Sequence, residues 1–432
     1  MERQPGVAPI GARGLALDVL DRVLGEHRPL DEAFAGHPQL DQLAARDRAH
    51  ARLLVATTLR RLGQIDAVLE AFLRASPKSL RVRNLLRLGA VQLLFLGTPA
   101  HAAVAETVAL AHGRESFARG LANAVLRRTA RDGPGLLEAQ DAARLNSPDW
   151  LWQSWSEAYG EKRTRSIALA HLLEPPLDLT VKEQPEVWAR RLEGQHLYGS
   201  TIRRAAGGVI EDLPGYAAGG WWVQDAAAAL PARLLPEVAG RRVIDLCAAP
   251  GGKTAQLAAA GARVDAVEVS PKRADRLRAN LARLGLEAEV VLADARDWRP
   301  EQPVDRLLLD APCTATGTIR RHPDIVRLRT PTDIARLAEL QSQLLGAAAR
   351  MLAPGGAMVY ASCSLQPEEG TGLLAAALEK GLPLERWPVT PDELGGLEVD
   401  LTAAGEVRTL PCHLAATGGL DGFFIARLRA RH

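Results

Sequence analysis

Residues 243–254, VIDLCAAPGGKT, contain a short apolar run, a loop of small residues and the start of a helix. Small side chains let the backbone of such a loop approach a ligand closely, and the helix that follows points its first N–H groups at the same place. The spacing matches neither the dinucleotide pattern GxGxxG nor the P-loop pattern GxxxxGK. The stretch therefore predicts a strand, a ligand-binding loop and a helix within an α/β sheet, without a phosphate cradle.

Short apolar runs and amphipathic segments alternate on the carboxyl-terminal side of this loop. The apolar runs are residues 262–270, 287–295, 305–313 and 355–364. A long helix is predicted over 331–352, and DGFFIARLRAR at 421–431 is predicted to form a closing strand. This alternation is typical of a mostly parallel sheet that helices cover on both faces. We therefore predict a Rossmann-like α/β domain over residues 226–432.

The amino-terminal part of the chain follows a helical pattern almost throughout residues 14–131. Leu17, Leu20 and Leu24 recur at three- and four-residue spacing, with charged residues on the opposite face. Helix breaks are predicted at Pro29, Pro77 and Pro99, and Asp132-Gly133-Pro134-Gly135 is expected to end the last helix. The pattern predicts an all-α bundle of roughly six to eight helices, which we assign to residues 1–140.

Residues 141–225 differ from both neighbours and are interpreted as a connecting module. An aromatic cluster of Trp150, Trp152, Trp155 and Tyr159 is expected to lie on a packed helix, and PPLDLTVK at 175–182 is expected to form a strand. Residues 210–225 are interpreted as a loop and a strand that lead into the α/β domain.

The composition is that of a globular protein, with 47% apolar and 24% charged residues among 432. No run of about 18 apolar residues occurs, so no membrane span is predicted. The first residues contain no apolar segment of the kind found in signal peptides. The four cysteines form no CxxC or Cys/His cluster, so no metal site is predicted. We expect a cytoplasmic monomer with reduced thiols.

The charge is distributed unevenly although the net charge is only +2. Residues 1–140 hold 19 Lys and Arg against 14 Asp and Glu. This excess is compatible with contacts to nucleic-acid phosphates and equally with an arginine-rich composition, and the sequence leaves both interpretations open.

Two carboxylates follow the strands after the small-residue loop. Glu268 comes at the end of the next strand, where a carboxylate is placed to accept hydrogen bonds from a ribose diol. Asp294 follows the third strand, where its side chain or a neighbouring amide is suited to an adenine edge. A ribose and an adenine without a phosphate cradle point to S-adenosylmethionine as the cofactor.

Two of the cysteines lie in polar turns at strand ends, Cys313 in DAPCTATG and Cys363 in YASCSLQPEE. A thiolate that adds to carbon 6 of a pyrimidine makes carbon 5 nucleophilic enough to accept a methyl group. Asp310, at the end of the same strand as Cys313, is placed to stabilise charge on the base. The two thiols thus predict methylation at carbon 5, but the sequence alone does not say which thiol attacks.

Other residues in this part of the chain have simpler interpretations. Cys247 and Cys412 are expected to be small buried hydrophobic residues. Lys253 and the run Arg320-Arg321-His322 are candidates to lower a thiol pKa or to bind phosphate. The two arginines are equally consistent with a solvated loop.

The motifs DLCAAPGGKT, DAPCTATGTIRRHPD and YASCSLQPEEG closely resemble those of the RNA cytosine-5 methyltransferases of the NOL1/NOP2/Sun family. Together with an amino-terminal domain similar to NusB, the whole chain resembles the bacterial 16S rRNA methyltransferases of the RsmB/Sun type. The resemblance implies that Cys363 is the nucleophile and that Cys313 assists product release. The excess positive charge of the amino-terminal domain suggests that it binds and positions RNA or docks on a ribosomal protein. It implies cofactor contacts from Cys247, Ala248, Ala249, Pro250, Gly251, Gly252, Lys253, Glu268, Asp294 and Asp310.

The chain departs from the family pattern at two places. Glu268 stands where many relatives have Asp, and Ala315 replaces the first glycine of the commoner DAPCSGTG, which is expected to shift that loop. Two alternatives stay open: a cytosine-5 methyltransferase that acts on tRNA or another RNA, and a non-catalytic RNA-binding or antitermination factor. The motifs argue against an amino-group methyltransferase, which would carry a DPPY-like motif, and against a DNA cytosine methyltransferase.

Overall fold

The computed structural model describes residues 11–431 of the chain. The described residues cluster into two compact units. Unit 1 contains the described residues up to Gln153 together with His322–Arg329, and unit 2 contains residues 154–321 and 330–431. Within this range no helix has both the length and the apolarity needed to cross a membrane.

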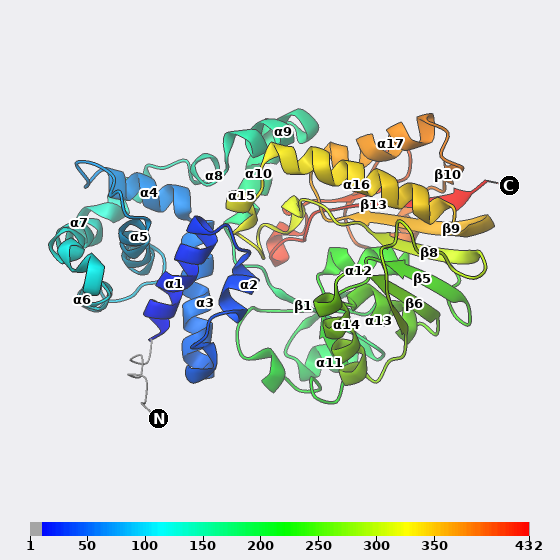
Figure 1. The fold of residues 1–432 in the computed structure, drawn as a ribbon, viewed down its shortest axis with the longest axis horizontal. Coiled ribbons are helices and arrows are strands. Elements are labelled where there is room, and N and C mark those ends of the chain that lie inside the picture. The colour runs from blue at the N-terminus through cyan, green and yellow to red at the C-terminus, as the bar shows by residue number, and fades with distance from the viewer. Residues whose placement is uncertain (1–10, 432) are drawn as a thin grey trace, which may run out of the picture. The chain divides into compact units, whose positions relative to one another are not determined.

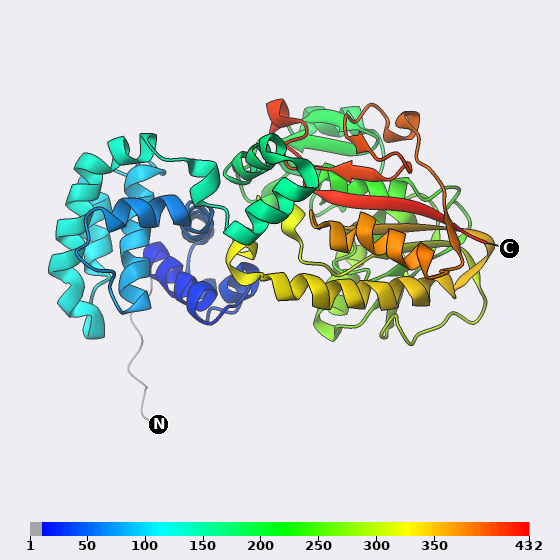
Figure 2. The same cartoon turned by 90° about the horizontal axis from the view of Figure 1, so that it is seen from above.

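Unit 1 has no strand among its described residues, and its helices form a bundle (Figures 1 and 2). The buried apolar side chains of these helices form one core. The core contains Leu20, Leu54, Leu86 and Leu126, which lie on four different helices. The helices are α1 (Ala12–Gly25), α2 (Leu30–Ala35), α3 (Ala45–Arg60), α4 (Leu62–Glu70), α5 (Leu80–Leu94), α6 (Ala100–Ala109), α7 (Arg119–Glu138), α8 (Ala142–Leu145) and α15 (Ile325–Leu328). The predicted all-α bundle is confirmed.

The predicted end of the bundle at residues 132–135 is wrong, because α7 continues through Pro134 to Glu138. The buried stripe of α7 includes Val125, Thr129 and Gly133, so its apolar face extends past the glycine. A Cβ atom on Gly133 would lie 3.0 Å from Leu94, which shows how closely the two helices pack here. Tertiary packing therefore outweighs the local preference of Gly and Pro for a helix end.

Part of the motif after Cys313 clusters with unit 1 and not with the sheet. The carboxylate of Asp324 accepts a hydrogen bond of 2.9 Å from the backbone N–H of Leu30, at the start of α2. A carboxylate at a helix start satisfies an otherwise unpaired donor. Residues 322–329 are thus anchored by the helical unit.

Unit 2 contains a nine-stranded sheet in the order β11-β12-β13-β9-β8-β5-β6-β7, with β10 paired to β13. Its strands are β5 (Arg242–Leu246), β6 (Arg263–Glu268), β7 (Glu289–Leu292), β8 (Val304–Asp310), β9 (Leu352–Ser362), β10 (Leu384–Arg386), β11 (Asp400–Leu401), β12 (Val407–Thr409) and β13 (Phe423–Ala430). The strands β9, β8, β5, β6 and β7 run parallel, and β13 joins β9 antiparallel. The Rossmann-like, mostly parallel sheet is confirmed.

Helices cover both faces of this sheet (Figure 1). Ile244 and Leu309 pack in one core with α16 (Pro331–Ala349) and α17 (Thr371–Glu379). Val243 and Leu308 pack in another core with α12 (Ala226–Arg233) and α13 (Gly252–Ala259), and α14 (Pro271–Leu284) packs against β6 and β7. Because adjacent residues of a strand point to opposite faces, a run such as Leu307–Leu309 is apolar throughout.

The connecting segment, residues 149–223, contains three helices and a small antiparallel sheet in the order β2-β3-β1-β4. Its elements are α9 (Asp149–Tyr159), α10 (Glu161–His171), β1 (Leu177–Val181), α11 (Pro185–Arg191), β2 (Gln195–Tyr198), β3 (Thr201–Arg204) and β4 (Trp221–Val223). The aromatic helix and the strands at 177–181 and 221–223 agree with the sequence prediction. The hairpin of β2 and β3 was not predicted, although Gly199-Ser200 supplies a two-residue turn with a left-handed glycine (φ 52°).

Candidate active site

The loop that the sequence singled out joins β5 to α13, at the carboxyl end of the parallel strands. Cys247 and Gly251 both have left-handed backbone conformations, with φ of 60° and 104°. A Cβ atom on Gly251 would lie 2.4 Å from Leu277 Cδ1, so only glycine fits at this turn. The N–H of Ala248 donates to the Val267 carbonyl at 3.1 Å, which holds the loop against the neighbouring strand.

Asp245 is the buried acid beneath this loop. Its Oδ2 accepts a hydrogen bond of 2.6 Å from the Thr254 hydroxyl, whereas its Oδ1 is buried without a partner. Burial raises the pKa of Asp245 to about 7. Burial likewise raises the pKa of Cys247 to about 12, so this thiol has no thiolate character near neutral pH.

Glu268 ends β6 beside the loop and is almost fully buried. Its carboxylate accepts hydrogen bonds from the N–H groups of Ala249 (3.3 Å) and Ser270 (3.0 Å). Asp294, after β7, is partly exposed and pairs with Arg296 at 2.6 Å, and this hydrogen bond lowers the pKa of Asp294. Because β6 pairs with β7, both carboxylates lie at the same edge of the sheet.

Asp310 ends β8 and binds Lys253, whose Nζ lies 2.7 Å from Asp310 Oδ2. Burial lowers the pKa of Lys253, but the negative groups around it, Asp310 foremost, together raise it by more, so the lysine stays charged. Lys253 Nζ also lies 5.3 Å from the centre of the Phe423 ring. The cofactor loop and the first cysteine motif are thus joined by an ion pair.

The two motif cysteines face each other, with 3.3 Å between Cys313 Sγ and Cys363 Sγ. Both cysteine residues are half-buried and neither forms a disulfide. The hydrogen bond to Cys313 and burial raise the pKa of Cys363 well above its ordinary value, and the positive charge of Lys253 opposes this rise. Cys363 is therefore a protonated thiol near neutral pH in this structure and must lose its proton before it can act as a nucleophile.

The loop after Cys313 packs closely against the second cysteine motif. The N–H of Gly317 donates to the Cys363 carbonyl at 2.9 Å, and a Cβ atom on Gly317 would lie 2.0 Å from the Gly422 carbonyl oxygen. Ala315 has a left-handed backbone with φ 59°, the conformation that glycine adopts at least cost. The departure from the family pattern at Ala315 therefore strains the backbone of this loop and does not remove its turn.

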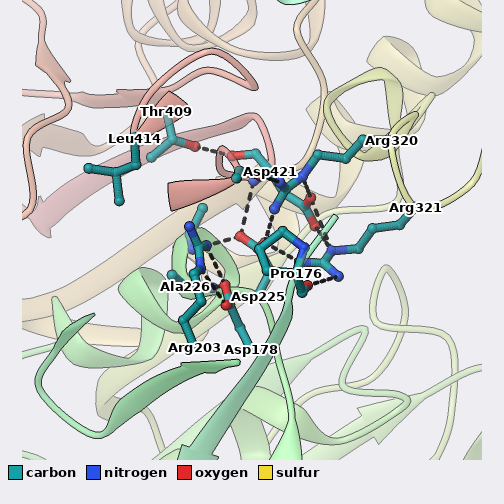
Figure 3. Close-up of polar contacts among 12 residues, drawn as sticks. Pro176, Asp178, Arg203, Asp225, Ala226, Arg320, Arg321, Thr409, Leu414 and Asp421 are labelled. Carbon is teal, nitrogen blue, oxygen red and sulfur yellow. Dashed lines mark hydrogen bonds and ion pairs between the residues drawn. The ribbon is translucent and has the colours of Figure 1, made fainter. Parts of the chain in front are cut away.

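Both interpretations of the two arginines are wrong, because they belong to a buried ion-pair network (Figure 3). Arg320 is 1% exposed and pairs with Asp225 (2.6 Å) and Asp421 (2.7 Å). Arg321 also pairs with Asp225 and Asp421, and Asp178 pairs with Arg203 in the same network. Charges bound in this way neither bind phosphate nor lower a thiol pKa; they hold the segment after Cys313 in place.

The sequence did not reveal that Asp225 and Asp421 form the ion pairs that hold Arg320 and Arg321. Asp225 precedes an alanine-rich run, which is the signal of a helix start, and its Oδ1 accepts the Ala227 N–H at 2.8 Å. That signal predicts the cap on α12, but only the fold shows that Arg320 and Arg321 share the same carboxylate.

Both parts of the chain match known protein families. Residues 232–429 match the family described as 16S rRNA methyltransferase RsmB/F, and residues 11–131 match the NusB family. The chain is 41% identical to ribosomal RNA small subunit methyltransferase B of Sodalis glossinidius, a match that covers 89% of this chain and 90% of that protein.

A second relative is ribosomal RNA small subunit methyltransferase B of Klebsiella pneumoniae, which is 37% identical and is matched over 98% of this chain and 99% of its own length. Among solved structures, that of PH0851 has a TM-score of 0.73 at 22% identity and covers 99% of this chain and 100% of its own. The structural similarity shows that the two proteins share a fold.

Proposed function

Because the chain belongs to the 16S rRNA methyltransferase RsmB/F family, we propose that it methylates carbon 5 of a cytidine in 16S rRNA through a covalent bond between Cys363 and the base. The chain is an rRNA methyltransferase, and its cofactor is S-adenosylmethionine. The observation that carries the proposal is the 3.3 Å separation of Cys363 Sγ and Cys313 Sγ beside the Lys253–Asp310 ion pair. Methylation of an exocyclic amine needs no thiol, whereas methylation of carbon 5 needs a nucleophile at carbon 6.

The cofactor-binding residues fit a ligand that has a ribose and an adenine but no phosphate. The carboxylates of Glu268, Asp294 and Asp310 suit hydroxyl, amine and ammonium donors, and they would repel a phosphate. The buried and unpartnered Oδ1 of Asp245 marks a polar acceptor beneath the same loop. We assign the cofactor contacts to Cys247–Lys253, Glu268, Asp294 and Asp310. When bound, S-adenosylmethionine supplies an electrophilic methyl group on its sulfonium.

The proposed reaction begins when an unpaired cytidine unstacks from the neighbouring bases and enters the site. The Cys363 proton passes to Asp310 and the Cys363 sulfur bonds to carbon 6, and the protonated Asp310 carboxyl then donates to the ring nitrogen, where negative charge develops. Carbon 5, now electron-rich, accepts the methyl group. A base then removes the carbon 5 proton, and Cys313 assists as the bond between Cys363 and carbon 6 breaks.

The function of each of the three parts of the chain is also a proposal. Residues 1–140 are assigned to RNA binding, residues 141–225 to connection and residues 226–432 to methyl transfer. An exposed apolar and basic stripe supports the first assignment: Phe117 is 75% exposed, and Leu121 and Ala124 extend the stripe along α7. Arg114 and Arg128 flank it and form no ion pair among the described residues. Aromatic rings and free arginines are the side chains that stack on bases and bind phosphates.

The type of methylated nucleoside tests this proposal directly. Purified protein is incubated with S-adenosylmethionine and 16S rRNA from a strain that lacks the gene, and the RNA is digested and analysed by mass spectrometry. We expect 5-methylcytidine from the native protein and none from Cys363→Ala. Formation of N4-methylcytidine would contradict the carbon 5 chemistry, and equal methylation of tRNA would favour the alternative substrate. No methylation of any RNA would favour the non-catalytic alternative.

A further inference from the structure

Glu369 is a buried carboxylate in the second cysteine motif, and the catalytic residues assigned so far do not include it. It ends a short 3-10 helix, Pro367–Glu369, that follows β9. Its side chain is fully buried, whereas that of the preceding residue, Glu368, is exposed. A carboxylate out of water needs hydrogen-bond donors around it, and the identity of those donors shows what it holds.

The carboxylate of Glu369 contacts the residue that follows each motif cysteine. Its Oε1 accepts the backbone N–H of Thr314 at 2.8 Å, and its Oε2 accepts the Thr314 hydroxyl. The same Oε2 accepts the hydroxyl of Ser364 at 2.6 Å. Thr314 follows Cys313 and Ser364 follows Cys363, so one side chain fixes both cysteine loops.

A second group of contacts fixes Glu369 itself. Gln341 on α16 donates from Nε2 to Glu369 Oε1 (3.1 Å) and to the Pro312 carbonyl (2.9 Å). The Tyr360 hydroxyl lies 3.1 Å from both Gln341 Oε1 and the Glu369 carbonyl oxygen, and these two acceptors share its one proton. The Glu369 carboxylate thus lies between the two cysteine loops and α16, and each of its hydrogen bonds is donated by a protein group.

We propose that Glu369 is a positioning residue that sets the separation and direction of the two thiols without touching the RNA base. The proposal rests on the proposed function, in which both thiols act on one base. An ionised carboxylate has about four acceptor sites, and here four donors use them. Burial raises the pKa of Glu369, and the hydrogen bonds from Ser364, Thr314 and Gln341 oppose this rise. Loss of the carboxylate would leave these buried donors without an acceptor.

A different role is harder to reconcile with the contacts. A general base must reach the proton that it removes, but Glu369 is fully buried and all its contacts come from protein donors. A role in fold stability alone would not require contacts to both residues that follow the cysteines. The positioning role predicts effects on thiol geometry that stability alone does not produce.

The test compares Glu369→Ala and Glu369→Gln with the matched control Glu368→Gln, which removes the neighbouring exposed charge. The first readout is the rate at which diamide closes a Cys313–Cys363 disulfide in the purified full-length protein. In this step both thiols lose their protons, an S–S bond forms, and two electrons and two protons pass to diamide, which becomes a hydrazine. This readout depends on thiol geometry and not on methylation.

We expect Glu369→Ala to slow disulfide closure about tenfold or more and to lower kcat by about 100-fold, with KM for RNA changed less than about threefold. Glu369→Gln keeps one acceptor oxygen and is expected to recover part of both losses. Glu368→Gln is expected to match the native protein in both readouts. All measurements are made well below the unfolding temperature of each variant, and Glu369→Gln carries the test if Glu369→Ala does not fold.

The other possible results distinguish the positioning role of Glu369 from the proposed function and from the observed thiol separation. Native closure rate and native kcat in a folded Glu369 variant would overturn the positioning role. A native closure rate with a lowered kcat would also overturn it, because Glu369 would then act on the substrate. Slow closure with full turnover would uphold the positioning role and contradict the proposed function instead. Failure of the native protein to form the disulfide would contradict the thiol separation from which the proposal starts.

Discussion

Cys313 and Cys363 lie 50 positions apart in the chain, yet their Sγ atoms are 3.3 Å from each other. The cause is the parallel pairing of β8 with β9, in which Asp310 lies opposite Ala361 and both chains turn at the same edge of the sheet. Both residues are half-buried. The short separation means that a molecule bound at one sulfur also lies beside the other.

Mild oxidation is expected to inactivate the native protein reversibly. Diamide should form one disulfide between Cys313 and Cys363, detected by peptide mass spectrometry, because the sulfurs need to move only a short distance to bond. Methylation should be lost and a thiol reductant should restore it. Cys412→Ala should behave like the native protein and Cys313→Ala should form no such bond. Retention of full activity by the disulfide form would contradict a role for either thiol in catalysis.

Substitution of each motif cysteine should have a different result. Cys363→Ala is expected to lose methylation completely while it binds S-adenosylmethionine with an affinity within about threefold of native, because the carbon 6 bond cannot form. Cys313→Ala is expected to accumulate a protein–RNA adduct, since release of Cys363 is impaired. A denaturing gel with labelled RNA detects the adduct as a slowly migrating band. A band from Cys363→Ala instead would reverse the two assignments.

Ala315 is a site where the native residue is less favourable than glycine. Its φ of 59° lies in the left-handed region, which costs an alanine about 1 kcal/mol more than a glycine. Ala315→Gly is therefore expected to raise the free energy of unfolding by roughly 0.5 kcal/mol after the entropy of the unfolded glycine is subtracted. Chemical denaturation measures this. Ala260→Gly, at φ −80°, should instead lower the free energy of unfolding; equal signs for both would exclude backbone strain at Ala315.

The sheet and the position of the thiols were predictable because each depends on a local pattern. The run Leu307–Leu309 is apolar without alternation, which is a property of a strand buried on both faces, and it ends in Asp310 and Cys313. Once two such strands are known to be parallel neighbours, their carboxyl ends must meet. The pairing of Cys313 with Cys363 follows from topology, and the sequence alone did not assign their roles.

Other features depended on contacts between distant residues, which the sequence does not display. Arg320 looks like a loop residue until Asp225 and Asp421 are brought to it. The antiparallel strand β11 (Asp400–Leu401) is too short to have a pattern of its own and is defined by its partner β12. Pro134 remains helical because Gly133 before it packs against Leu94.

The buried acid Asp245 should make stability fall as the pH rises. Its pKa is raised from 3.8 to about 7 in the folded protein, so between these pH values the folded state holds a proton that the unfolded state has released. Over this window Asp245 reduces the stability of the cofactor-free protein, by up to about 4 kcal/mol at its upper end. Asp245→Asn removes this dependence and still accepts the Thr254 hydroxyl.

Denaturant unfolding from pH 4 to pH 8 compares Asp245→Asn with the native protein and with Asp297→Asn, an exposed control. The stability of Asp245→Asn relative to native should rise through the window and then level off. A constant difference between the two proteins at every pH would show that Asp245 is ionised throughout.

The exposed stripe on unit 1 should contribute to RNA affinity through two separable terms. Phe117→Ala removes a stacking surface and is expected to weaken RNA binding by about 1–2 kcal/mol with an unchanged salt dependence. Arg128→Glu removes a phosphate contact, so it should weaken binding and also reduce the slope of log K against log salt by about 0.7 for a single-stranded site. Fluorescence anisotropy with an rRNA fragment measures both. As controls at exposed positions of unit 2, Leu173→Ala removes a large apolar side chain and Arg276→Glu makes the same charge change as Arg128→Glu. Equal losses from these controls would show that the stripe has no special role, whereas losses confined to Phe117 and Arg128 would assign RNA binding to the helical unit.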